Sequence, residues 1–201
     1  MLLDYKVPAY IRAPFVAEVK RISALLGCAP ELLMLLMNSE SGINPAAYNK
    51  NGGATGLIQF MPSTAKGLGT TTVNLKAMNH LVQLQYVYKY FKPYSGRLKS
   101  FHDLYLVTFF PVAIGKADDW IFHTDHLSAK SIALANPGIA KYGPAPKEYI
   151  TVDAFKKYTS AKLAQFKDYL PAATDSGSSP AILPIVIGLA VGVVFALAAM
   201  R

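Results

Sequence analysis

Residues 40–65 read ESGINPAAYNKNGGATGLIQFMPSTA, and the rest of the chain is organised around this stretch. It begins with Glu40, which follows the apolar run LLMLLM at residues 32–37. An apolar run of this kind is typical of a helix buried at the centre of a domain. The glycine-rich middle of the stretch is typical of an irregular loop. The sequence therefore predicts a buried helix with a carboxylate at its end, followed by a loop.

Helical spacing of apolar residues recurs up to residue 168, and no strand pattern or internal repeat is convincing. Pro14 suits the first turn of a helix, Thr151 suits an N-cap, and Asn136, Pro137 and Gly138 form a helix stop. The fold class is therefore mainly α. We expect helices at residues 14–27, from 30 or 31 to 40, from 63 or just before it, 75–91, from 101 or 102 to 110, 127–135 and 151–168.

The C-terminal part of the chain differs in composition from the rest. Residues 171–181 read PAATDSGSSPA, which is typical of a flexible linker. Residues 182–200 read ILPIVIGLAVGVVFALAAM and contain no charged residue. A helix of this length would span roughly 28 Å, close to the roughly 30 Å of a bilayer core. We therefore expect a helical domain at 1–170, a linker at 171–181 and one transmembrane helix at 182–200.

Composition and charge narrow the range of partners. With 52% apolar residues among 201, the chain can bury a sizeable core. The net charge of +8 favours anionic polymers such as peptidoglycan or anionic lipid. The basic residues are scattered along the chain, so we expect no nucleic acid partner. Cys28 is the only cysteine, which excludes an intramolecular disulfide, and we expect it in the core.

The order ESG, loop, GLIQ and MPSTA resembles the signature of the lytic transglycosylases of the lysozyme superfamily. This family includes the soluble lytic transglycosylase (SLT) domain and goose-type-lysozyme-like proteins. The resemblance covers about residues 15–160 and is tight over 40–65. It implies a lysozyme-like helical domain that cleaves the MurNAc–GlcNAc β-1,4 bond of peptidoglycan glycan strands, without a cofactor.

Glu40 is the candidate catalytic residue. Cleavage of a glycosidic bond needs an acid, so the pKa of an ordinary glutamate must be raised. Burial behind an apolar helix and the negative end of the helix dipole both raise it. Most glycosidases pair two carboxylates, yet no Asp or Glu lies between Glu40 and Asp103. The resemblance implies that Glu40 acts first as acid and then as base. The substrate N-acetyl group assists at C1, and the C6 hydroxyl closes a 1,6-anhydro ring.

The resemblance also assigns candidate substrate-binding residues. Ser41 would hold Glu40 or the N-acetyl group, with a plain helix C-cap as the alternative. Gln59 would line the cleft floor, with a structural hydrogen bond to the loop as the alternative. Gly56 would allow a tight backbone near the sugar. Tyr86 or Tyr105 would replace an aromatic residue that is missing further on, although a core role is the preferred interpretation of each.

Residues 83–116 resemble a phage-encoded branch of the family. Cellular members have Ala-Tyr-Asn-Ala-Gly where this chain has FFPVA at residues 109–113, so no sugar contact is transferred there. The N-terminal sequence MLLDYKVPAYIRAPF lacks the apolar core of a secretory signal. Together with the apolar residues 182–200, this favours an enzyme anchored in the internal membrane of a phage virion, with other virion proteins as candidate partners. A bacterial envelope protein is the alternative location.

No metal site is expected. Residues 136–155 resemble a stretch that reads as a calcium loop in some phage relatives, but here no Asp or Glu precedes Glu148. The histidines show neither zinc spacing nor an HExxH pattern; they are His80, His102, His123 and His126.

Two alternatives to the transglycosylase remain. A hydrolytic muramidase on the same fold would use water in place of the C6 hydroxyl. A non-catalytic structural or glycan-binding protein would keep the fold alone. The intact Glu40–Ser41 pair and the GLIQFMPSTA run argue against the second alternative, whereas the missing Tyr-Asn motif argues slightly for it.

Overall fold

The computed structural model describes residues 1–164 and residue 166, so the linker and apolar segment predicted at 171–200 lie outside the described residues. The described part is mainly helical and fits a lysozyme-like α domain. It contains isolated β-bridges and no named strand, which confirms the predicted fold class for this part of the chain. The elements, α-helices (α) and 3-10 helices (η), are η1 (Asp4–Lys6), α1 (Ala9–Leu26), α2 (Pro30–Ser41), α3 (Pro62–Gly67), α4 (Thr72–Ala77), α5 (His80–Phe91), η2 (Lys92–Tyr94), α6 (Phe101–Phe109), η3 (Pro111–Ala113), α7 (Ala129–Ala135), α8 (Pro137–Ala140) and α9 (Val152–Leu163).

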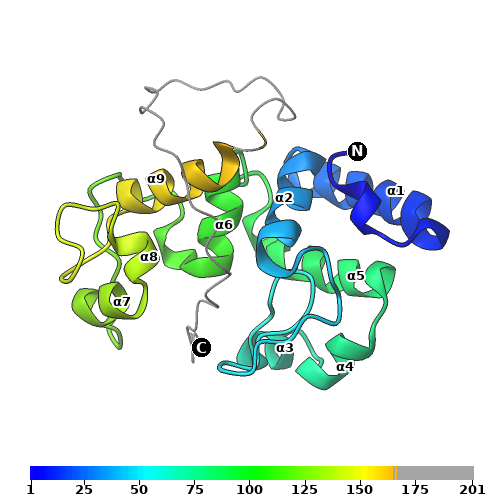
Figure 1. Cartoon of the computed structure of the whole chain (residues 1–201), viewed down its shortest axis with the longest axis horizontal. Helices are drawn as coiled ribbons and strands as arrows, with labels where there is room; N and C mark the ends of the chain where they lie inside the picture. The colour runs from blue at the N-terminus through cyan, green and yellow to red at the C-terminus, as the bar shows by residue number, and fades with distance from the viewer. Residues whose placement is uncertain (165, 167–201) are drawn as a thin grey trace.

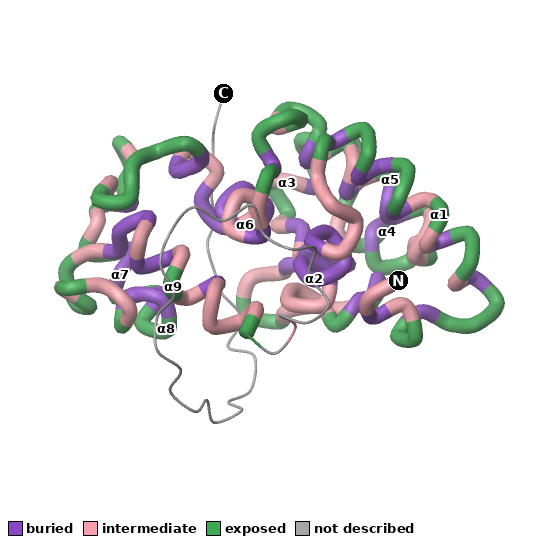
Figure 2. The backbone as a smooth tube through the Cα atoms, turned by 90° about the horizontal axis from the view of Figure 1, so that it is seen from above, coloured by how far each residue is buried: buried purple, intermediate pink, exposed green. Residues whose placement is uncertain are grey.

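Helices α2 and α6 occupy the middle of the molecule. In Figure 1, α1, α3, α4 and α5 lie on one side of them and α7, α8 and α9 on the other. The apolar run at 32–37 is buried in α2, as its composition predicts. Figure 2 shows the buried residues concentrated along α2 and α6, with exposed residues on the outer helices and loops. Helix α2 therefore lies at the boundary between these two groups of helices.

Helix α1 begins earlier than predicted. The sequence predicts Pro14 in its first turn, but the helix starts at Ala9 and has Pro14 in its interior. Ile11 is 7% exposed and lies four residues before the buried Phe15, so burial of its side chain stabilises the additional turn. Pro14 removes only one backbone hydrogen bond of that turn. Gly27 ends the helix with φ 73°, as predicted.

The long helix predicted at residues 75–91 is two helices, α4 and α5, so that prediction is wrong. The Asn79 side chain accepts a hydrogen bond from the Val82 amide at 3.0 Å and begins α5. Asparagine is a strong N-cap residue, and this cap stabilises a new helix start where the apolar pattern suggests continuity.

Side-chain caps also begin α4, α6, α7 and α9. Ser100 and Asp103 form a capping box at the start of α6. Thr151 caps α9 by accepting a hydrogen bond from the Ala154 amide at 3.1 Å, as predicted.

Pro137, expected within a helix stop, instead begins the short helix α8, because proline suits a first helical position.

Cys28 is half-buried and packs against the core rather than within it. In residues 1–164, no helix by itself has the length and hydropathy needed to cross a membrane; α1 and α2 meet that requirement only as a pair, with a bend of 111° between them.

Candidate active site

Glu40 lies in the last turn of α2, where the helix meets the loop at residues 42–61. Gly42 ends the helix in the left-handed conformation, with φ 65°, and its amide donates to the carbonyl of Asn38 at 3.0 Å. The left-handed turn allows the chain to reverse direction directly after the carboxylate.

The Glu40 carboxyl is desolvated, although the residue as a whole keeps partial exposure. Desolvation by burial is the largest influence and raises the pKa of Glu40 to about 7. A hydrogen bond from Tyr105 and the positive charge of Lys162 act in the opposite direction. A carboxyl with this pKa is present in both protonation states near neutral pH, so it can donate and accept a proton.

Two tyrosines on neighbouring helices approach Glu40. Tyr105 of α6 is 5% exposed, and its hydroxyl is a hydrogen-bond partner of the Ser39 and Glu40 side chains. Tyr90 of α5 donates to the carbonyl of Val107 at 2.7 Å. Burial is the main cause that raises the pKa of both phenols, and the nearby Glu40 carboxylate raises each further. Both therefore remain neutral donors at neutral pH.

Lys162 brings a positive charge to the same place from the last turn of α9. Its Nζ donates to Ser39 Oγ at 3.0 Å. The same Nζ lies 5.2 Å from the ring centroids of Tyr105 and Tyr158. Residues from α2, α6 and α9 therefore meet around one carboxyl.

The loop at 42–61 is tied to the end of α2 by Ser41. Its hydroxyl contacts the carbonyls of Met37 at 3.0 Å and Leu57 at 2.9 Å, and it accepts from the Asn44 amide at 3.2 Å. These backbone contacts support the alternative in which Ser41 has a structural role. A contact between Ser41 and substrate stays a prediction.

Gln83 of α5 holds the same loop through two of its backbone groups and also binds one backbone group of α4. Its side-chain amide donates to the carbonyls of Pro45 at 2.9 Å and Leu75 at 2.8 Å, and its oxygen accepts from the Leu57 amide. Gly56 has φ 83°, and a Cβ at this position would lie 2.4 Å from Gln83 Oε1. Glycine is therefore required at position 56 by its backbone conformation and by the contact with Gln83.

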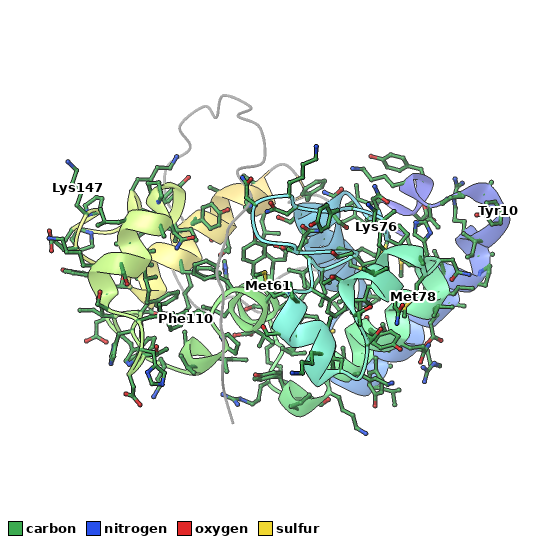
Figure 3. The ribbon with its side chains drawn as sticks, turned by 90° about the horizontal axis from the view of Figure 1, so that it is seen from below. Tyr10, Met61, Lys76, Met78, Phe110 and Lys147 are labelled. Atoms are coloured by element: carbon green, nitrogen blue, oxygen red, sulfur yellow. The ribbon has the colours of Figure 1, made fainter. Side chains whose placement is uncertain are left out.

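Gln59 has a left-handed backbone with φ 53°, which is uncommon for a residue other than glycine. Its side-chain amide donates to the Gly56 carbonyl at 3.1 Å. Gln59 also lines a cavity of about 30 Å³ together with residues 58, 60 and 61, Thr64, Tyr90 and Thr108. Figure 3 shows Met61 near the middle of the molecule, between the parts that carry Phe110 and Met78. Gln59 thus lies on the loop, next to the tyrosine that approaches Glu40.

Tyr86 lies one turn before Tyr90 on α5 and is half-buried against the core. The Nζ of Lys89 lies 4.9 Å from its ring centroid. Among the contacts described for residues 1–164, none joins Tyr86 to Glu40 or Gln59. The aromatic residues that the structure places beside Glu40 are Tyr90 and Tyr105, and the role predicted for Tyr86 stays a prediction.

Within residues 1–164, no group of three or more His, Cys, Asp or Glu side chains is arranged to hold a metal. Glu148, in the stretch that resembles a calcium loop, pairs instead with Lys130 at 3.1 Å on the surface.

Three residues around the site are not part of the motif at residues 40–65 and could not be predicted from it. Gln83 carries a usable signal, because it shares a buried helix face with Val87 and Phe91, and a buried amide needs partners. Tyr90 and Lys162 carry none, since only tertiary packing brings them to Glu40. The sequence leaves two roles open for Tyr105, a core residue and an aromatic residue of the site. Its side chain is buried in the core and also contacts Glu40.

Comparison with known proteins agrees with this geometry. Residues 20–92 match the family model described as the transglycosylase SLT domain. The match includes α2, Glu40, the loop at 42–61 and the part of α5 that holds the loop. Neither curated proteins nor solved structures give a significant match to the chain. Residues 20–92 are thus similar to the transglycosylase SLT domain, in agreement with the resemblance to the lytic transglycosylases over this part of the chain.

Proposed function

We propose that the protein is a peptidoglycan lytic transglycosylase that cleaves the MurNAc–GlcNAc β-1,4 bond with Glu40 as its single acid and base. The observation that carries this proposal is the Glu40 carboxyl at the end of α2, whose pKa is raised by burial to about 7. SLT domains are domains of lytic transglycosylases, so the family match supports cleavage of peptidoglycan in general.

The reaction proceeds in two steps with balanced proton transfers. Protonated Glu40 donates its proton to the glycosidic oxygen, and the N-acetyl oxygen of MurNAc attacks C1 as the C1–O bond breaks. The Glu40 carboxylate then takes the proton of the C6 hydroxyl as O6 attacks C1 and displaces the N-acetyl oxygen. A 1,6-anhydro ring forms, and Glu40 returns to its protonated state. A pKa near 7 suits both steps.

The surroundings of Glu40 support a single carboxylate in preference to a pair. The side chains that act on its pKa are Tyr105 and Lys162, and no Asp or Glu of the described chain is among them. A glycosidase that activates water usually places a second carboxylate within about 10 Å of the acid. The lack of a carboxylate among these influences agrees with the substrate hydroxyl as nucleophile, and the product analysis below separates this from attack by water.

Replacement of Glu40 tests the assignment directly. Glu40→Gln keeps the shape but cannot donate a proton, so clearing of purified peptidoglycan should fall by at least about 100-fold. Glu148→Gln, on an exposed residue, is the matched control and should retain wild-type activity. Unchanged clearing by Glu40→Gln would refute the assignment.

Product analysis separates transglycosylase from muramidase. Mass spectrometry of digested peptidoglycan should show 1,6-anhydromuramic ends, which are one water lighter than hydrolysed ends. Reducing ends alone would favour the muramidase. Binding without any cleavage would favour the non-catalytic alternative.

We also propose that residues 182–200 anchor the enzyme in the internal membrane of a phage particle. Support comes from the uncharged apolar sequence, the preceding linker, and the phage-like residues 83–116. In this location the enzyme would reach the cell wall during entry. Extraction of the full-length protein from purified particles should require detergent, whereas a chain that ends at residue 170 should not. Extraction without detergent would contradict the proposal, and so would absence from particles.

A further inference from the structure

The last turn of α9 reaches the end of α2, which is distant from it in the sequence. Lys162 Nζ donates to Ser39 Oγ at 3.0 Å, and Ser39 directly precedes Glu40. An ammonium group has only hydrogens to donate, so Ser39 accepts this bond and keeps its own hydroxyl proton for another partner.

That partner is Tyr105. Its hydroxyl is a hydrogen-bond partner of both the Ser39 and Glu40 side chains. Lys162, Ser39, Tyr105 and Glu40 thus form a directed series of donors that begins at an ammonium and ends at a carboxyl. Successive hydrogen bonds of this kind polarise one another, so a positive charge at one end strengthens the donor at the other.

The aromatic rings fix the position of the ammonium. Lys162 Nζ lies 5.2 Å from the ring centroids of both Tyr105 and Tyr158. Cation–π contacts of this length hold a cation over a ring. The contact with Tyr105 means that one side chain, Lys162, constrains both the ring and the hydrogen-bond series of the tyrosine.

The other charged or titratable groups around Glu40 have different partners. Tyr90, on α5, donates to the Val107 carbonyl. Lys6, from η1, donates to Asn38 Oδ1 at 2.7 Å, two residues before Glu40. Of these groups, Lys162 is the cation that acts on the Glu40 carboxyl, and it lowers a pKa that burial raises.

We propose that Lys162 is a positioning residue of the glycosidase site, which holds Ser39 and Tyr105 against Glu40 and stabilises the Glu40 carboxylate formed after proton donation. The proposal rests on the function proposed above. It explains how a desolvated carboxyl can lose its proton in the first step and take one back in the second.

The test compares three variants of the full chain. Lys162→Met removes the charge and keeps the length of the side chain, whereas Lys162→Arg keeps the charge. Lys157→Met is the matched control, because Lys157 lies on the same helix but pairs with Asp153 at 2.7 Å on the surface. The first readout is the pKa of Glu40, measured by NMR titration of its ¹³C-labelled carboxyl. This measurement does not require an active enzyme. The second readout is the pH profile of kcat and KM.

Loss of the cation should raise the pKa of Glu40 by about one unit. The alkaline limb of kcat/KM should move upward by the same amount in Lys162→Met. In the same variant kcat should fall about 10-fold with KM changed less than about twofold, since a positioning role acts on the transition state. Lys162→Arg should restore most of both properties, and Lys157→Met should match the wild type.

A Glu40 pKa and pH profile in Lys162→Met equal to those of Lys157→Met would overturn the proposal. If Lys162→Met does not fold, Ser39→Ala decides, because it removes the middle of the donor series without altering α9; an unchanged Glu40 pKa and kcat in that variant would also overturn it. An inactive wild-type enzyme would contradict the proposed function instead, while the carboxyl titration would still report on Lys162.

Discussion

At the scale of single residues, Gly56 is constrained in two separate ways. Its φ of 83° disfavours any side chain, and an added Cβ would lie 2.4 Å from Gln83 Oε1. We expect Gly56→Ala to lower the free energy of unfolding by about 3 kcal/mol, from left-handed strain and overpacking together. Gly69→Ala is the control, since Gly69 has φ 76° with no atom within 4 Å of an added Cβ. It should lose only about 1 kcal/mol. Equal losses in urea denaturation would show that the contact with Gln83 is unimportant.

Glu40 makes stability depend on pH in the direction opposite to an ordinary ion-paired carboxylate. Burial raises the pKa of Glu40 from 4.5 to about 7, so the folded state binds more protons than the unfolded state between these values. The contribution of this residue therefore becomes less favourable as pH rises through that interval. Glu40→Gln should be more stable than the wild type at pH 8 by about 1 to 3 kcal/mol. The difference should disappear below about pH 4.5. Denaturant melts at several pH values would measure it, and a constant difference would contradict the raised pKa.

At the scale of elements, α5 organises the loop at 42–61 through a single side chain. Gln83→Leu would leave the Leu57 amide and the carbonyls of Pro45 and Leu75 without this partner. Hydrogen exchange of the Leu57 amide should accelerate about 10-fold or more relative to amides of α9. Gln85→Leu on the exposed face of the same helix is the control; its amide donates to Glu18 instead. Unchanged exchange at Leu57 would mean that the loop is held by other contacts.

The helix boundaries show what the sequence can and cannot predict at this scale. Apolar spacing locates α2, α6 and α9, because each has a continuous buried face. It fails where one local interaction decides the boundary. The cap by Asn79 divides a predicted helix, and burial of Ile11 extends α1 past Pro14. Neither event changes the apolar period, so neither is visible in it.

The candidate site, like the helix boundaries, could be predicted only in part from the sequence. Residues 40–65 are contiguous, so their motif is sufficient to predict Glu40 at a helix end and Gln59 on the following loop. The partners of Glu40 come from α6 and α9, and their positions depend on how those helices pack. The motif is sufficient to predict Glu40 as the candidate acid, but only the fold shows that Lys162 and Tyr105 lie close enough to lower its pKa.

At the scale of the whole molecule, the site lies where three distant segments of the chain meet. Figure 1 shows α2 and α6 between the helices of the N-terminal part and those that end in α9. The SLT match covers residues 20–92, so it includes α2 and α5 but ends before Tyr105 and Lys162. The site therefore combines residues of the matched segment, such as Glu40, with residues that follow that segment, such as Tyr105 and Lys162.

The two buried phenols beside Glu40 have a consequence for the protein in alkali. Burial raises the pKa of Tyr90 and Tyr105 well above the ordinary value of 10. The unfolded chain loses these protons first, so stability falls as pH rises above about 10. Of the 12 tyrosines, these two should form phenolate only when the fold opens. A spectrophotometric titration should therefore show a late, cooperative phenolate step that coincides with loss of helical circular dichroism. Replacement of both tyrosines by phenylalanine should abolish that step, so the tyrosines beside the site act as an optical indicator of its integrity.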